Sequence, residues 1–164
     1  MTVGVENTEQ VLSAVQKAIA VYGTKKDELI PILTFINREL GYLPDWALTE
    51  LSIRLHMSKS QLFSVASFYE MLSTKPVGKH LIRFCESAPC HVVGGREVYD
   101  KMLEYLQIQP GETTLDGNWT LLNVSCLGIC GVGPVMMVDD EVYGNLTPQQ
   151  VPVIFNKILT GGGI

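Results

Sequence analysis

Apolar residues in the first half of the chain recur every three to four positions. This spacing covers four stretches, 8–22, 27–40, 45–55 and 58–72, and each is short and followed by a brief turn. Such a period predicts amphipathic helices with one buried face. Gly23 and Gly41 stand where the first two helices would end, as glycine commonly does. Four short helices joined by tight turns predict a small helical bundle.

The pattern changes after Thr74, where Pro76 and Gly78 interrupt it. Beyond this point, runs rich in Val, Leu, Ile and aromatic residues predict strands, and longer periodic stretches predict helices. The predicted strands are 80–85, 119–124, 135–138 and 142–143, and the predicted helices are 96–106 and one opening at Thr147-Pro148. The order strand, helix, strand, strand, strand, helix is typical of a small α/β domain of the thioredoxin-like type. We therefore expect a helical domain over 1–74 and a thioredoxin-like domain over 75–164.

Several single residues carry further expectations. Phe68 and Tyr69 on the fourth helix belong either to the core of the bundle or to a surface for a partner, and of the two we expect the core. His80 is expected at the surface, and Asp139 is expected to be a solvated loop charge. No Ser/His/Asp set or paired carboxylates occur at a spacing that predicts hydrolytic chemistry.

Composition excludes some classes of partner. The chain has 164 residues, of which 46% are hydrophobic and 18% charged, as expected for a globular protein. Its formal net charge is -5 and no run of Lys and Arg occurs, which argues against nucleic acid as a partner. No stretch of 18 apolar residues predicts a membrane span. No secretory signal is visible at the N-terminus, so we expect a cytoplasmic protein whose cysteines stay reduced.

Four cysteines form two close pairs. The first pair is Cys85 and Cys90, in a Cys-x4-Cys arrangement, and the second is Cys126 and Cys130, in a Cys-x3-Cys arrangement. Thiolates are soft ligands that select iron–sulfur clusters, zinc or Cu(I), and a [2Fe-2S] cluster takes four of them. We therefore predict one [2Fe-2S] cluster, with one cysteine pair on each iron.

Three glycines surround the second pair. Gly128, Gly131 and Gly133 would let the backbone turn sharply and approach the sulfurs, so that N–H groups could donate to them. We expect replacement of Gly128 or Gly131 by a β-branched residue to shift or destabilise the centre.

Other interpretations of the cysteines remain open at this point. A structural zinc site usually has Cys-x2-Cys spacing, which neither pair matches. Thiol–disulfide exchange normally uses Cys-x-x-Cys at a helix N-terminus. Four inert buried cysteines are the third alternative, because free cysteine is often buried. A zinc- or thiol-based binding module is thus the competing hypothesis.

The motifs resemble those of a known family. The run Arg83-Phe-Cys85-Glu-Ser-Ala-Pro-Cys90 and the run Cys126-Leu-Gly-Ile-Cys130-Gly-Val-Gly-Pro134 are similar to those of the small thioredoxin-like [2Fe-2S] subunit of NADH dehydrogenases, the NuoE family. Gly41-Tyr-Leu-Pro44, 65–69 and 108–117 extend the resemblance over nearly the whole chain.

The resemblance implies an electron-transfer subunit that is not catalytically self-sufficient. The ligands of the family's cluster correspond to Cys85, Cys90, Cys126 and Cys130. In this family the partner is a larger Fe–S flavoprotein subunit of the NuoF type, which holds FMN and the NADH site. Relatives also serve NAD-linked hydrogenases, NAD-dependent formate dehydrogenases and electron-bifurcating complexes. Consistent with nucleotide sites that lie in the partner, the chain itself contains neither a Gly-x-Gly-x-x-Gly motif after a strand nor a P-loop.

Overall fold

The computed structural model describes residues 8–161 and divides into two compact units, Met1–Val77 and Gly78–Ile164. Each unit has a hydrophobic core of its own.

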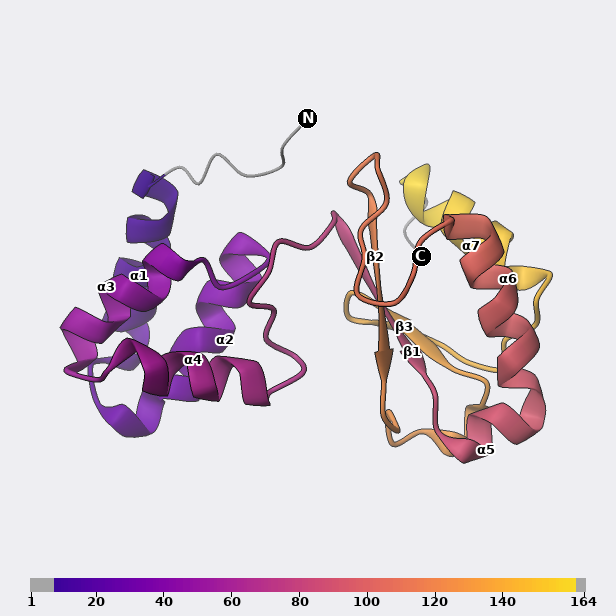
Figure 1. Ribbon diagram of the computed structural model, residues 1–164, viewed down its shortest axis with the longest axis horizontal. Coiled ribbons are helices and arrows are strands. Elements are labelled where there is room, and N and C mark those ends of the chain that lie inside the picture. Colours follow the sequence, from indigo (N-terminus) through magenta and orange to yellow (C-terminus); the bar gives the residue numbers. More distant parts are fainter. Residues whose placement is uncertain (1–7, 162–164) are drawn as a thin grey trace. The chain divides into compact units, whose positions relative to one another are not determined.

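The described part of the first unit is helical (Figure 1). Its elements are α1 (Thr8–Tyr22), the short 3-10 turn η1 (Lys26–Glu28), α2 (Leu29–Leu40), α3 (Asp45–Leu55) and α4 (Lys59–Phe68). Gly41 ends α2 in a left-handed conformation, with φ of 80°. Ser58 and Gln61 begin α4 with reciprocal side-chain-to-backbone hydrogen bonds, a capping box. The apolar faces of the helices meet in one core that contains Val15, Ile32, Leu48, Leu51 and Leu62.

The end of α4 differs from the prediction. Leu62 and Leu72 are buried as expected and Tyr69 packs against the core, but Phe68 is 78% exposed. Leu62 and Ala66 are the buried residues of α4, and Phe68, the last residue of the helix and two positions beyond Ala66, lies off this buried face. The prediction that Phe68 lies in the core is therefore wrong. Its ring instead makes an edge contact with Tyr69, with 5.2 Å between ring centroids.

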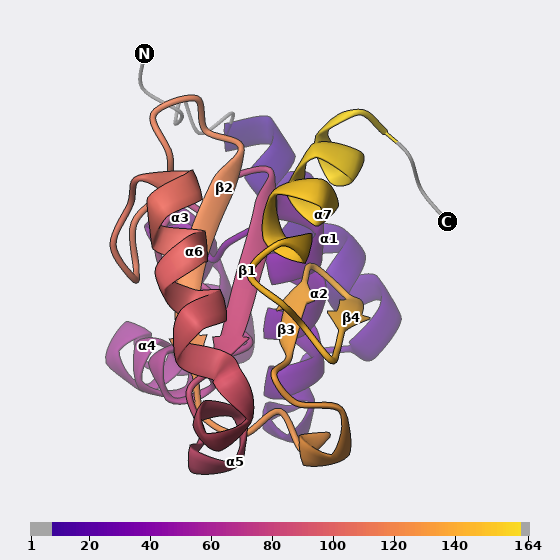
Figure 2. The ribbon, with the colours of Figure 1, turned by 90° about the vertical axis from the view of Figure 1, so that its right-hand side faces the viewer.

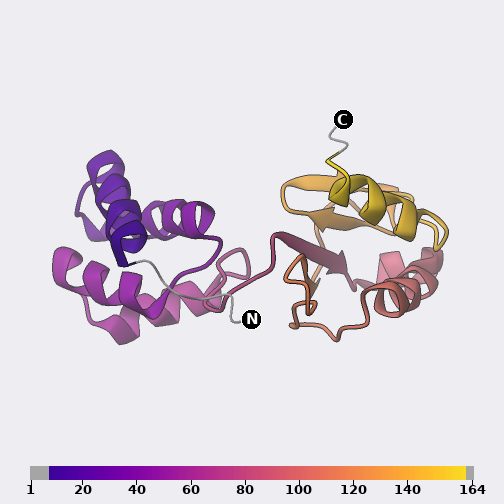
Figure 3. The same ribbon diagram turned by 90° about the horizontal axis from the view of Figure 1, so that it is seen from above.

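The second unit is a four-stranded sheet with helices against it. The strands are β1 (His80–Cys85), β2 (Trp119–Val124), β3 (Met136–Val138) and β4 (Glu141–Tyr143), in the order β2-β1-β3-β4. β1 and β2 are parallel, whereas β3 is antiparallel to both β1 and β4. Parallel neighbours need a crossover connection. α6 (Arg96–Leu106) and the segment 107–118 supply it by leading from β1 back to the start of β2 (Figure 3).

α6 and α7 (Gln150–Leu159) cover one face of this sheet (Figure 2). Ile82 and Phe84 of β1 and Leu121 of β2 point to this side, because alternate residues of a strand share a face. They pack with Met102 of α6 and Phe155 of α7. The predicted order of long helices and strands in this unit is confirmed. None of the helices between residues 8 and 161 has the length and apolar character to cross a membrane.

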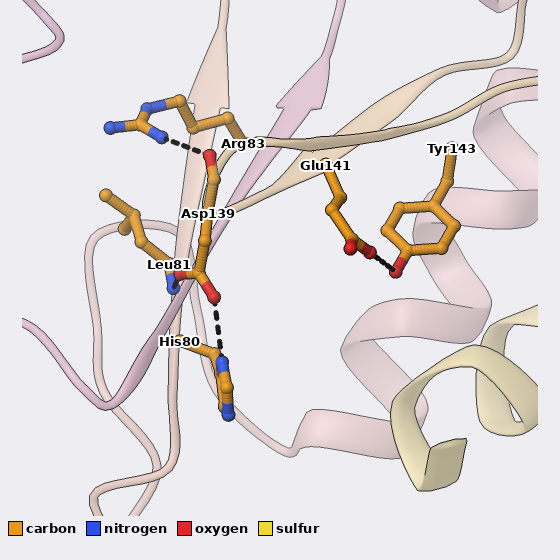
Figure 4. A network of polar contacts seen from close by, with 6 residues as sticks. All are labelled: His80, Leu81, Arg83, Asp139, Glu141 and Tyr143. Carbon is orange, nitrogen blue, oxygen red and sulfur yellow. Dashed lines mark hydrogen bonds and ion pairs between the residues drawn. The ribbon is translucent and has the colours of Figure 1, made fainter. Parts of the chain in front are cut away.

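A polar network joins the β3–β4 turn to the start of β1 (Figure 4). Asp139 Oδ1 accepts a hydrogen bond from the Leu81 N–H at 2.8 Å, and Asp139 Oδ2 lies 2.8 Å from His80 Nδ1. Arg83 Nη1 donates to the Asp139 carbonyl at 3.3 Å. The His80 side chain is only 16% exposed. The prediction of a surface His80 is therefore wrong, because the turn folds back against β1. Asp139 is an exposed charge in a turn, as predicted, and it also accepts these hydrogen bonds.

Candidate metal centre

The carboxyl ends of β1 and β2 bring the first cysteines of both pairs to one edge of the sheet. Cys85 is the last residue of β1 and is in register with Val124, the last residue of β2. Cys126 follows Val124 by two residues. Because parallel strands end at the same edge, two segments 41 positions apart in the sequence begin their loops together.

The second cysteine of each pair lies in a short helical turn at this edge. Cys90 ends α5 (Ala88–Cys90), visible at the lower end of the second unit in Figure 1. Cys130 begins the 3-10 turn η3 (Cys130–Val132). β3 then runs antiparallel to β1, so that the Val135 carbonyl accepts the Cys85 N–H at 3.2 Å. Both cysteine loops are therefore fixed to the end of β1.

The two pairs differ in exposure. Cys85 and Cys90 are buried, at 1% and 0% exposure, whereas Cys126 and Cys130 are exposed. The Sγ atoms of Cys126 and Cys130 are 3.3 Å apart. All four thiols are free, so no disulfide competes with metal binding. One pair thus lies inside the protein and the other at its surface.

Hydrogen bonds and burial shift the pKa values of the two thiols of the inner pair, Cys85 and Cys90, in opposite directions. Burial raises the pKa of Cys90 to about 11. Burial acts in the same direction on Cys85, but N–H groups of Ser87 and Leu127 and the thiol of Cys90 donate to its sulfur, and together they hold the pKa of Cys85 below its ordinary value. Cys85 therefore ionises more readily than Cys90.

The pKa values of the outer pair, Cys126 and Cys130, are also shifted in opposite directions. The Gly128 N–H donates to Cys126 Sγ at 3.3 Å and is the largest cause that lowers the pKa of Cys126. The hydrogen bond to Cys126 raises the pKa of Cys130. Thiolate is the form of cysteine that binds metal. In each pair, therefore, one thiol has a lowered pKa and the other a raised one.

The three glycines of the second loop, Gly128, Gly131 and Gly133, differ in how closely they approach a cysteine sulfur. Gly128 has a left-handed φ of 83° and donates to a sulfur, as described above. A Cβ built on Gly133 would lie 3.3 Å from Cys90 Sγ and 3.3 Å from Val93 Cγ2. A Cβ on Gly131 would meet no atom within 4 Å. Close approach to sulfur is therefore a property of Gly128 and Gly133, and Gly131 has free space beside it.

The donor set suits a two-iron cluster. Four thiols from two loops converge on one sheet edge, and in each pair the ionisation of at least one thiol responds to a thiol of the other pair. Within residues 8–161, no three His, Cys, Asp or Glu side chains are arranged around a single metal ion. A [2Fe-2S] cluster makes a different demand, since each iron takes only two protein sulfurs.

Sequence reasoning missed several backbone donors. The N–H groups of Ser87 and Leu127 reach Cys85, and that of Val135 reaches Cys90. The sequence also gave no sign of how closely Gly95 approaches this loop: a Cβ there would lie 2.5 Å from the Cys90 carbonyl oxygen. Only Ser87 offered a signal in the sequence, because serine between two ligands often forms local hydrogen bonds.

Known proteins are similar to this chain in sequence and in fold. The family model for thioredoxin-like [2Fe-2S] ferredoxins matches residues 15–159. The E subunit of NADH-quinone oxidoreductase from Salmonella typhimurium is 37% identical over 128 residues, which cover 78% of this chain and 77% of that protein. The corresponding protein of Escherichia coli K12 is 34% identical over 144 residues, covering 88% of this chain and 87% of that one.

A solved structure agrees in fold. The crystal structure of an NAD+-reducing [NiFe]-hydrogenase in the air-oxidized state superposes with a TM-score of 0.70 at 21% identity. The match covers 82% of this chain and 23% of the hydrogenase chain. The extent of the family match and the identity to the two oxidoreductase proteins together lead to one conclusion: this chain belongs to the thioredoxin-like [2Fe-2S] ferredoxin family.

Proposed function

We propose that the chain is an electron-transfer subunit of an NADH-linked oxidoreductase complex, and that Cys85, Cys90, Cys126 and Cys130 hold one [2Fe-2S] cluster. The observation that carries this proposal is the convergence of four free thiols from two distant loops on one edge of the sheet. Membership in a family of [2Fe-2S] ferredoxins supports it.

The protein's own groups have defined tasks in this proposal. The thiolates bind the irons, and the cluster, when bound, gains and loses one electron. The N–H groups of Ser87, Leu127 and Gly128 donate to sulfur and stabilise its negative charge. Gly133 leaves room beside Cys90. Gly131 follows Cys130 directly, and a Cβ there would meet no atom within 4 Å.

The exposed pair marks the place where electrons would enter or leave. Cys126 and Cys130 lie at the surface, whereas the inner pair is covered by protein. Several apolar side chains near these loops are also exposed, namely Val92, Val93, Ile129 and Val132. Exposed apolar side chains around the loops favour contact with another protein, because burying them stabilises association.

The proposed partner is the larger flavoprotein subunit of the NuoF type, which would hold FMN and NAD(H). The similar proteins of Salmonella typhimurium and Escherichia coli are named as subunits of NADH-quinone oxidoreductase, and the structural relative is an NAD+-reducing hydrogenase. This chain would then exchange single electrons with the flavin-bearing protein. It would act only as part of the complex.

The proposal extends to domains and location. Residues 1–74 would form a four-helix annex, and residues 75–164 would form the ferredoxin domain. The helical annex is proposed as a second docking surface, because Phe68 and Met71 expose apolar side chains there. We place the chain in the cytoplasm, peripheral to any membrane that its complex reaches, since the four thiols require a reducing compartment.

Affinity purification from the native host tests this function. The tagged chain is expected to bring down a flavoprotein that contains FMN, and addition of NADH to that complex is expected to reduce the cluster. The chain alone with NADH is the control and should remain oxidised. If the purified complex holds no flavoprotein, or if NADH leaves the cluster oxidised, the proposed function is wrong.

A further inference from the structure

A segment outside the cysteine motifs lies against the loop that carries Cys130. Directly after β4, the Asn145 N–H donates to the Val132 carbonyl at 2.6 Å, and the Leu146 N–H donates to the Pro134 carbonyl at 3.1 Å. Val132 belongs to the same 3-10 turn as Cys130. Two backbone hydrogen bonds therefore tie residues 145–146 to the second cysteine loop.

Gly144 makes this close approach possible. A Cβ built on Gly144 would lie 2.9 Å from the Cβ, the Cγ2 and the carbonyl oxygen of Val132. Real Cβ atoms do not approach other atoms so closely, so any side chain at Gly144 requires a displacement. The φ of Gly144 lies outside the left-handed region, which means that steric contact and not backbone strain sets the requirement.

The displacement would fall on the cysteine loop because Gly144 is held on both sides. Before it, β4 pairs with β3, and the Tyr143 hydroxyl donates to Glu141 Oε2 at 2.6 Å (Figure 4). After it, Leu146 is buried at 5% exposure in the core beneath the sheet. Val132 is 39% exposed and belongs to a three-residue turn, so packing restrains it less than it restrains Leu146.

We propose that Gly144 is a positioning residue for the metal centre: its lack of a side chain lets residues 144–146 hold the turn that carries Cys130. This inference rests on the proposed cluster assignment. Gly144 does not itself touch a sulfur; it acts through Val132.

The test compares Gly144→Ala with Gly131→Ala in the cluster-containing protein. Gly131 is next to Cys130, has no left-handed φ and has open space where Ala would place its Cβ, so it is a matched control. Gly144→Ala should shift the reduction potential in an EPR-monitored redox titration. It should also speed iron release to a chelator on the order of tenfold, as expected for overpacking. Gly131→Ala should leave both measurements at the wild-type values.

A double variant separates positioning from general damage. Gly144→Ala combined with Val132→Gly removes two of the three close contacts and should return the potential toward the wild-type value. Should Gly144→Ala fail to fold, amide hydrogen exchange of the wild-type protein decides. The amides of Asn145 and Leu146 should then exchange more slowly with the cluster bound than in the metal-free protein.

The outcomes distinguish this inference from the proposed function. A wild-type protein that never contains iron contradicts the cluster assignment itself. A wild-type protein with a cluster, together with a Gly144→Ala variant of unchanged potential and iron release, overturns only the positioning role. Equal exchange of the two amides with and without the cluster overturns it as well.

Discussion

Gly133 and Cys90, from different cysteine loops, lie so close together that a Cβ on Gly133 would be 3.3 Å from the Cys90 sulfur. The backbone of Gly133 is extended, with φ of -63° and ψ of 155°, so alanine could adopt it without strain. The absence of a side chain here matters because of the sulfur and not because of the backbone.

Gly133→Ala is therefore expected to weaken the centre. The added methyl group must push Cys90 Sγ or Val93 by a few tenths of an ångström, and overpacking of this kind destabilises by about 1–3 kcal/mol. Cluster occupancy after purification and iron release to a chelator measure the effect. Gly131→Ala, two residues away with open space, is the control and should behave as wild type. The reverse ranking of the two variants would contradict this geometry.

The thiols of the metal-free protein should react in a defined order. Thiolate is the reactive form, and Cys126 combines an exposed sulfur with a lowered pKa. Cys90 combines burial with a raised pKa. Iodoacetamide should thus modify Cys126 first and Cys90 last near neutral pH, as followed by peptide mass spectrometry. The same chain in denaturant should react without preference, and a uniform rate in the folded chain would disprove the assigned environments.

The stability of the metal-free protein should fall at alkaline pH because of Cys90. Its pKa is raised from the ordinary value of 9.0 to about 11, so the unfolded chain loses this proton first as the pH rises. The contribution of Cys90 is fully present below pH 9 and is lost as the pH rises towards 11. Urea unfolding at several pH values measures this. The Cys90→Ala variant should lose less stability than the wild-type protein over the same pH range. An identical loss in the two proteins would show that Cys90 is not the cause.

Alanine substitutions at two residues of α4 should distinguish a loss of stability from a loss of docking. Leu62 is fully buried, so Leu62→Ala should lower the free energy of unfolding by about 2–5 kcal/mol. Phe68 is 78% exposed, so Phe68→Ala should change it by no more than about 0.5 kcal/mol. If the helical annex docks on the complex, Phe68→Ala should still reduce recovery of the flavoprotein in affinity purification. Unchanged recovery would remove Phe68 from the docking surface.

Much of the second unit could be predicted from its sequence. The strands ending at Cys85 and Val124 are six-residue segments rich in apolar residues, and a periodic helix from Arg96 to Leu106 separates them. A helix between two such strands predicts a parallel pair, which in turn predicts that the loops carrying Cys85 and Cys126 meet. The site follows from this order because the strand ends determine which loops are neighbours.

The remainder depends on contacts between distant segments. Phe68 is the last residue of α4 and lies off its buried face, and the sequence has no strong stop signal there. The contact of His80 with Asp139 forms because a three-residue strand and its turn fold back on β1. Gly144 resembles an ordinary turn glycine, and only the structure reveals Val132 beside it. A hydrophobic pattern reports which face is buried, but it does not report which backbone atoms touch.

The central claim is that four thiolates hold one two-iron cluster, and metal and sulfide analysis combined with EPR of the purified chain tests it most directly. We expect equal amounts of iron and acid-labile sulfide, about two of each per chain, and an EPR signal that appears on reduction by one electron. Serine in place of Cys85, Cys90, Cys126 or Cys130 should alter or abolish that signal. A colourless protein that contains zinc and no sulfide would contradict the claim.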